Sequence, residues 1–189
     1  MNTNKVAEAK YENAPTWIFW DISFMPVPKG HLSKAGEIAQ KLKSALNKLN
    51  YRGPVSIIAY GNMNHVPTSI KKALSSAGIA LNHVSGGSRE TISHFEDDLL
   101  FLLMENTPAP ANLMLIARHP ALMDSLGEMQ SEGYNILLAT HLNADDSFLS
   151  CATTAWLWVG LWDEPEPEPE PAPASLPEPE PEPAPASLP

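Results

Sequence analysis

The sequence contains a single cysteine, Cys151, and no apolar run that approaches the length of a membrane span. One cysteine excludes an intramolecular disulfide and a cysteine-rich zinc site, so we expect an intracellular, cytoplasmic protein. The longest apolar runs, such as residues 99–104, are far shorter than the ~20 residues needed to cross a bilayer, which predicts no membrane insertion. Residues 1–12 lack an apolar stretch after a basic region, so no secretory signal is expected.

The chain also lacks an excess of positive charge, since its formal net charge is −10. Most of this charge belongs to residues 163–189, which hold 8 of the 22 acidic residues and 11 of the 19 prolines. The remaining residues 1–162 carry 14 acidic against 12 basic side chains, a net charge of −2. This near-neutral body has no strongly basic stripe of the kind that dedicated duplex-DNA binders carry.

Residues 166–177 and 178–189 are two identical copies of EPEPEPAPASLP. Proline at nearly every second position and repelling carboxylates predict a disordered, extended polyproline II segment without a core. Either a solubilising spacer or a proline-dependent docking site for a protein partner fits this composition. We therefore expect a flexible N-terminus at 1–15, one domain at 16–162 and a disordered acidic proline-rich tail at 163–189.

Residues 16–162 alternate strand-like apolar runs with segments of helical periodicity. The predicted strands are 16–20, 54–60, 79–84, 112–117 and 134–139, followed by a last apolar stretch at 154–159. The predicted helices are 33–49, 69–77, 91–105 and 121–132, and Lys41, Lys43 and Lys48 should lie on the solvated face of the first. This alternation predicts an α/β fold with a mainly parallel sheet and helices on both faces. Ligands of such folds bind at the carboxyl ends of the strands.

Acidic residues at or near the predicted strand ends are the candidates for chemistry. Asp21 directly follows the apolar run Trp17-Ile-Phe-Trp20, where a carboxylate is costly unless it is solvated, paired or bound to a cation. Several such acids would hold Mg²⁺ or Mn²⁺ through oxygen ligands and activate water against a phosphodiester. Asp21 is as well explained as a cap of the proline-rich loop that follows it.

A set of short motifs in fixed order resembles the plant NYN domain. The motifs are Trp20-Asp21-Ile22, Val27-Pro-Lys-Gly30, Gly53-Pro-Val-Ser-Ile57, Ala59-Tyr-Gly61, Ala73-Leu-Ser-Ser76, Leu81-Asn-His-Val84, Pro108-Ala-Pro-Ala-Asn112, Tyr134-Asn-Ile-Leu-Leu-Ala139 and Trp156-Leu-Trp158. This group is similar to the limkain-type endonuclease domain of meiosis regulator and mRNA stability factor proteins, within the PIN-like nucleases. The resemblance implies a Rossmann-like three-layer α/β/α fold, metal-dependent RNA cleavage by clustered aspartates, post-transcriptional regulation of gene expression, and an association with peroxisomes.

Only part of the acidic set that the resemblance implies is present. Asp21 matches the first-strand acid, and Asp98 matches the helix acid, although the adjacent Asp97 leaves an ambiguity of one residue. Asn62 stands where an aspartate usually follows Ala-Tyr-Gly. In Ala117-Arg-His-Pro-Ala-Leu122, His119 and Ala121 replace two further acids. The resemblance therefore implies Asp21 and Asp98 as catalytic and metal-binding residues of an impaired site, with Mg²⁺ or Mn²⁺ bound weakly or not at all.

Four residues are predicted to contact substrate, namely Lys29, Asn62, Arg118 and His119. Lys29 lies in the loop after Asp21, at the rim where single-stranded RNA would run. His119 is open to three interpretations, which are neutral drift, a phosphate contact shared with Arg118, and a catalytic base. The function hypotheses that remain are a residual ribonuclease, an RNA-binding pseudoenzyme and a protein-interaction scaffold with a docking tail. The sequence alone does not determine an oligomeric state.

Overall fold

The fold is taken from a computed structural model that describes residues 4–101, 107–118 and 120–163. The predictions for His119 and for the tail from residue 164 onward lie outside these described residues.

Within the described residues, six strands form one all-parallel sheet in the order β3-β2-β1-β4-β5-β6. The strands are β1 (Thr16–Asp21), β2 (Val55–Gly61), β3 (Ala80–His83), β4 (Asn112–Ile116), β5 (Asn135–Thr140) and β6 (Thr154–Leu157). The expected α/β fold with a parallel sheet is confirmed. The order reverses between β1 and β4, which is the switch point at which ligands bind in doubly wound folds.

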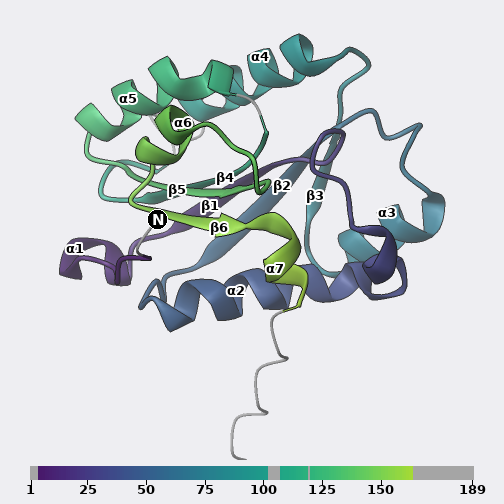
Figure 1. The fold of residues 1–189 in the computed structure, drawn as a ribbon, viewed down its shortest axis with the longest axis horizontal. Helices are drawn as coiled ribbons and strands as arrows, with labels where there is room; N and C mark the ends of the chain where they lie inside the picture. Colours follow the sequence, from purple (N-terminus) through teal and green to yellow (C-terminus); the bar gives the residue numbers. More distant parts are fainter. Residues whose placement is uncertain (1–3, 102–106, 119, 164–189) are drawn as a thin grey trace, which may run out of the picture.

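Helices cover both faces of this sheet (Figure 1). One layer contains the 3₁₀ helix η1 (Lys29–Glu37), α2 (Ile38–Lys48), α3 (Thr68–Ser76) and α7 (Trp158–Trp162). The other contains α4 (Ser88–Asp98), η3 (Pro120–Leu122), α5 (Met123–Ser131) and α6 (Asp146–Ser150), while the short α1 (Ala9–Glu12) lies at one end of the sheet. No helix within the described residues is both long and apolar enough to span a membrane.

Alternating side chains of the strands supply two separate cores. Ile18 and Trp20 point to the α2 layer, whereas Phe19 points to the α4 layer. Phe19, Trp20 and the α7 residue Trp158 are buried and fill these cores. Trp17 and Trp156 are only half-buried.

Three local expectations are wrong. The predicted helix at 33–49 begins as the irregular 3₁₀ helix η1, with non-helical backbone at Lys34, and becomes α-helical only at Ile38. The apolar stretch 154–159 is a strand only to Leu157, and its last two residues start α7. Lys41 is 6% exposed rather than solvated, on a helix against which α7 packs. In these three places the packing of neighbouring elements, rather than the local sequence pattern, determines the structure.

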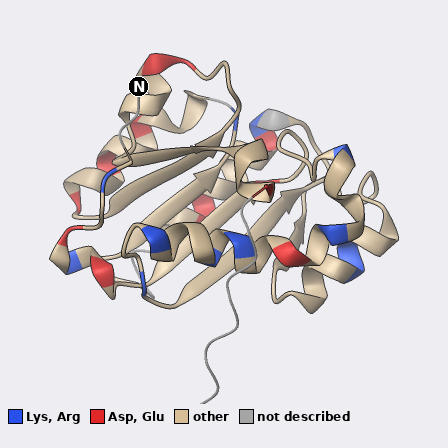
Figure 2. Cartoon of the chain, turned by 60° about the horizontal axis from the view of Figure 1, so that its bottom comes forward, with Lys and Arg blue, Asp and Glu red and all other residues tan. Residues whose placement is uncertain are grey.

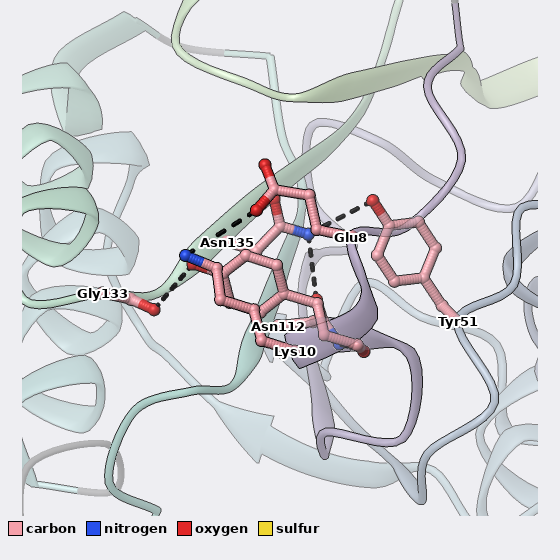
Figure 3. A network of polar contacts seen from close by, with 7 residues as sticks. Glu8, Lys10, Tyr51, Asn112, Gly133 and Asn135 are labelled. Atoms are coloured by element: carbon pink, nitrogen blue, oxygen red, sulfur yellow. Dashed lines mark hydrogen bonds and ion pairs between the residues drawn. The ribbon is translucent and has the colours of Figure 1, made fainter.

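A network of hydrogen bonds lies at the amino-terminal ends of the strands (Figure 3). Asn135 on β5 donates to the side-chain oxygen of Asn112 on β4 at 2.9 Å and to the hydroxyl of Tyr51 at 3.3 Å. Asn112 donates in turn to the carbonyl of Tyr11 in α1 at 3.0 Å. Because buried amides are costly unless paired, this network fixes α1 on the edge opposite the switch point.

The two helical layers carry opposite charge (Figure 2). Helices η1, α2 and α3 hold seven lysines and one acid, Glu37. Helices α4, α5 and α6 hold seven acids and one arginine, Arg89. The near-neutral body therefore has one basic and one acidic face, and we call the first of these, formed by η1, α2 and α3, the basic layer.

Candidate functional site

A row of side chains crosses the carboxyl ends of the strands on the α4 face of the sheet. Asp21 and Tyr60 are register partners on β1 and β2. On the other side of Asp21, Ala117 follows β4 and lies next to Thr140, because Ile116 pairs with Ala139 on β5. Strand alternation directs all four side chains to the α4 face, where Phe19, Leu115 and Leu138 form the core below them.

Asp21 lies at the centre of this row and is 5% exposed. Its Oδ1 atom accepts hydrogen bonds from the backbone N–H groups of Ser23 and Phe24, each at 3.2 Å. Its backbone carbonyl accepts a third bond from the N–H of Met25 at 2.8 Å. The carboxylate therefore holds the turn by which the chain leaves β1, as the loop-capping interpretation of Asp21 requires.

Asp98 is directed at the same row, whereas its neighbour Asp97 is exposed. The hydroxyl of Tyr60 donates to Oδ2 of Asp98 at 2.5 Å, within the range of a charge-assisted hydrogen bond. Burial, together with the Asp98 carboxylate, raises the pKa of the Tyr60 hydroxyl well above its ordinary value. Tyr60 thus connects helix α4 to the strand position beside Asp21, and Asp98 is the acid of the pair that lies near the site.

The Tyr60 to Asp98 bond predicts a specific pH dependence of stability. Since the folded state raises the pKa of Tyr60 above its unfolded value of about 10, its contribution is complete below pH 10 and falls as the pH rises further. We expect Tyr60→Phe to lower the free energy of unfolding at pH 7 by about 1–3 kcal/mol, because Asp98 loses a donor. Between about pH 10 and 11 the variant should lose stability less steeply than wild type.

Urea denaturation across this range measures both effects. The same slope in the two proteins above pH 10 would show that Tyr60 is not the titrating group.

Asn62 joins the loops that follow β1 and β2. Its backbone N–H donates to Oγ of Ser23 at 3.1 Å, and its Oδ1 accepts the N–H of Asn64 at 3.1 Å. The side chain is half-buried and lines a cavity with Ile22 and His65. The structure therefore places Asn62 at the strand-end edge, in a cavity that Asp21 and Asp98 do not line.

The other predicted contact residues lie around this edge. Lys29 is exposed and begins η1. Arg118 is exposed just after β4, beside the switch point, and Ala121 is exposed in η3. His119 lies outside the described residues, so its three interpretations stay predictions.

The described acids do not converge on a site for a resident Mg²⁺ or Mn²⁺ ion, which takes six oxygen ligands, usually one or two carboxylates together with waters or substrate phosphates. Within residues 4–101, 107–118 and 120–163, no three His, Cys, Asp or Glu side chains form a group that could hold a metal. The Asp21 Oδ1, Asp98 Oδ2 and Asn62 Oδ1 atoms each accept hydrogen bonds from the protein itself. The described residues therefore do not form a ready-made metal site.

Sequence reasoning missed one polar member of the row, Tyr60. Tyr60 was visible only as part of an apolar strand, although its position next to Gly61 at the strand end was a signal. Thr140 is 2% exposed, and its Oγ1 has no hydrogen-bond partner among the described residues. Its position directly after the predicted strand at 134–139 had already placed it at the carboxyl ends of the strands.

Comparison with known proteins agrees with this geometry. The family model described as the NYN domain matches residues 15–156, which include the whole row and both helical layers as far as β6. No curated protein matches the chain. NYN domains are a family of RNA endonucleases of the PIN-like ribonuclease group, whose members are typically metal-dependent. With its all-parallel sheet and acids at the switch point, the chain belongs to the NYN domain family.

Proposed function

We propose that the protein is an RNA-binding NYN protein of the plant limkain type, impaired in catalysis, that acts in post-transcriptional regulation. The separation of charge between the two helical layers is the observation that carries this proposal. Five of the seven lysines in the basic layer are exposed and its one acid, Glu37, is half-buried, so this face attracts a polyanion although the net charge of the body is close to zero.

The basic layer reaches the candidate site at the carboxyl ends of β1 and β2. Lys29 begins η1 soon after Asp21 and is exposed there. Lys71 in α3 donates from Nζ to the carbonyl of Met63, in the loop after β2, at 3.0 Å. A strand of RNA with its phosphates on these lysines would therefore pass the ends of β1 and β2.

Impaired catalysis is proposed from the residues at the site. Asn62 and Ala121 are neutral where the resembling family has acids, and the two retained acids serve protein hydrogen bonds. Asp21 caps a turn, and Asp98 accepts the Tyr60 hydroxyl. Without further carboxylates, little negative charge remains to gather a hard cation beside a bound phosphate.

The proposal predicts that binding depends on the basic layer. The double variant Lys29→Glu with Lys72→Glu reverses two exposed lysines, on η1 and on α3. We expect its affinity for single-stranded RNA to fall about tenfold or more at moderate salt. The slope of log K against log salt should become shallower by about 1.4, for two lost phosphate contacts.

Fluorescence anisotropy with a labelled RNA oligonucleotide measures both quantities. The matched control is Lys5→Glu with Lys10→Glu, which changes the net charge equally at the amino-terminal segment, near the opposite edge of the sheet. Equal losses of affinity in the two double variants would show that overall charge, and not the basic layer, governs binding.

A protein-interaction scaffold is the second candidate, and one surface favours it. An apolar hollow of about 360 Å³ lies between the loop after β1 and the β6 to α7 segment. Leu142 and Val159 line it and are 81% and 50% exposed. Exposed apolar groups around a hollow are typical of protein contacts, and a folded chain that binds no RNA would favour this function.

A further inference from the structure

A cavity of about 200 Å³ lies at the strand-end edge, on the side of the basic layer. We call it the loop pocket, because the loops after β1 and β2 form it together with η1 and α3. Its apolar floor contains Ile22, Val27 and Ile70, which are 3%, 7% and 5% exposed. Ser23, Asn62 and His65 supply its polar groups. The first residue along the chain that lines the loop pocket is Ile22, which directly follows Asp21.

The polar side chains of the loop pocket are held in place, but some of their hydrogen-bonding atoms have no partner among the described residues. Asn62 is oriented by the bond from the Asn64 N–H to its Oδ1, and its Nδ2 has no hydrogen-bond partner among the described residues. His65 is exposed, and its backbone N–H donates to the carbonyl of Asn62 at 3.0 Å. The imidazole ring makes no polar contact within the described part of the chain. An oriented amide and an uncommitted aromatic ring therefore flank an apolar floor.

We propose that the loop pocket binds one unstacked nucleobase of single-stranded RNA. The Asn62 amide faces the polar edge of the base, and the His65 ring stacks on it above the floor of Ile22, Val27 and Ile70. This inference rests on the proposed RNA-binding function and names the form of RNA that the site accepts.

The chemistry of the pocket fits a base better than a phosphate or a charged metabolite. Its floor is apolar and no Lys or Arg of the described residues lines it, so a buried phosphate would be left without a partner charge. The lysines belong instead to η1 and α3, the two helices that contribute to its walls, where they can hold phosphates outside the pocket. Proteins read single-stranded RNA in this way, with splayed bases on aromatic or apolar surfaces and amides at the base edges.

The size of the pocket limits what it holds. Pockets for drug-sized ligands have volumes of about 300–1,000 Å³, so 200 Å³ fits a single ring system. A base within an RNA duplex is stacked and paired and cannot enter without being extruded. The loop pocket therefore predicts a preference for single strands that carry bases over duplexes and over strands without bases.

The test measures the affinity of the full chain for two labelled probes by fluorescence anisotropy. One probe is a uridine oligonucleotide, and the other is a ribose-phosphate strand of the same length without bases. We expect wild type to bind the uridine strand about fivefold or more tightly, as one stacked base would give. His65→Ala should remove most of this preference without changing the salt slope, because no phosphate contact is lost.

Two further variants make the result specific. Asn62→Ala should also reduce the preference for bases, and its melting temperature reports whether the loop is intact. His94→Ala removes an exposed histidine from α4, on the acidic face of the protein, and should behave as wild type.

The outcomes separate this inference from the proposed function. If wild type binds both probes equally, or if His65→Ala keeps the full preference for bases, the loop pocket does not bind a base while RNA binding by the basic layer stands. If wild type binds neither probe, the proposed function fails and the inference fails with it.

Discussion

Metal-dependent cleavage of single-stranded RNA is expected to appear when Asn62, His119 and Ala121 are all replaced by aspartate. Residues that follow parallel strands converge on the switch point, and Asn62 follows β2 while Ala121 follows β4, on either side of Asp21. The three new carboxylates would add the oxygen ligands that Mg²⁺ and Mn²⁺ prefer. With Mn²⁺ present we expect the cleavage rate to rise by about 100-fold or more over wild type.

The same variant should show a linked change in stability. Clustered carboxylates repel one another without a cation, so the triple variant should melt below wild type in chelator and recover in Mn²⁺. Adding Asp21→Ala should abolish cleavage again, which controls for a contaminating nuclease. A triple variant that is folded and stabilised by Mn²⁺ but cuts no RNA would show that the missing acids do not explain impaired catalysis.

Trp20→Ala is expected to have the largest effect on stability among single substitutions at the core. Trp20 is fully buried, and its ring lies 5.2 Å from that of Trp158. Its Nε1–H donates to the carbonyl of Met25 at 2.7 Å, while Trp158 donates to that of Pro26 at 3.0 Å. The two indoles thus fix the loop after β1, and removing one should lower the free energy of unfolding by about 3–5 kcal/mol.

Two related variants separate packing from hydrogen bonding. Trp20→Phe keeps most of the buried ring but leaves the Met25 carbonyl without its donor, so a loss of about 1–3 kcal/mol is expected. Trp17→Ala removes a half-buried ring from the same strand and should cost less than Trp20→Ala. Urea denaturation measures all three, and equal losses for Trp17→Ala and Trp20→Ala would contradict the role given to Trp20.

The architecture could be predicted because alternating strands and amphipathic helices allow few arrangements. Nearly continuous apolar runs, such as those at β1, β4 and β5, predict strands that are covered on both faces, and this pattern is typical of a parallel sheet. Local details could not be predicted. The irregular start of η1 and the turn of residues 158–159 into α7 depend on which elements pack together, and periodicity within one segment carries no information on that.

The candidate site could be predicted only in part. Asp21 was visible because a carboxylate after an apolar strand is unusual, and the structure identifies Asp98 rather than Asp97 as the acid near it. Tyr60 was hidden by its apolar strand. The net charge of the body gave no sign of the basic layer, because the lysines of η1, α2 and α3 and the acids of α4, α5 and α6 cancel in it. Only the fold assigns these two sets to opposite faces.

We propose that this NYN protein binds RNA without cutting it efficiently. The most direct test incubates the full chain with Mn²⁺ and labelled single-stranded RNA and scores binding and cleavage in the same samples. We predict salt-dependent binding that is weakened by Lys29→Glu with Lys72→Glu, and no cleavage that depends on the metal. Cleavage that is stimulated by Mn²⁺ and lost in Asp21→Ala would contradict impaired catalysis and identify the wild-type chain as an active ribonuclease.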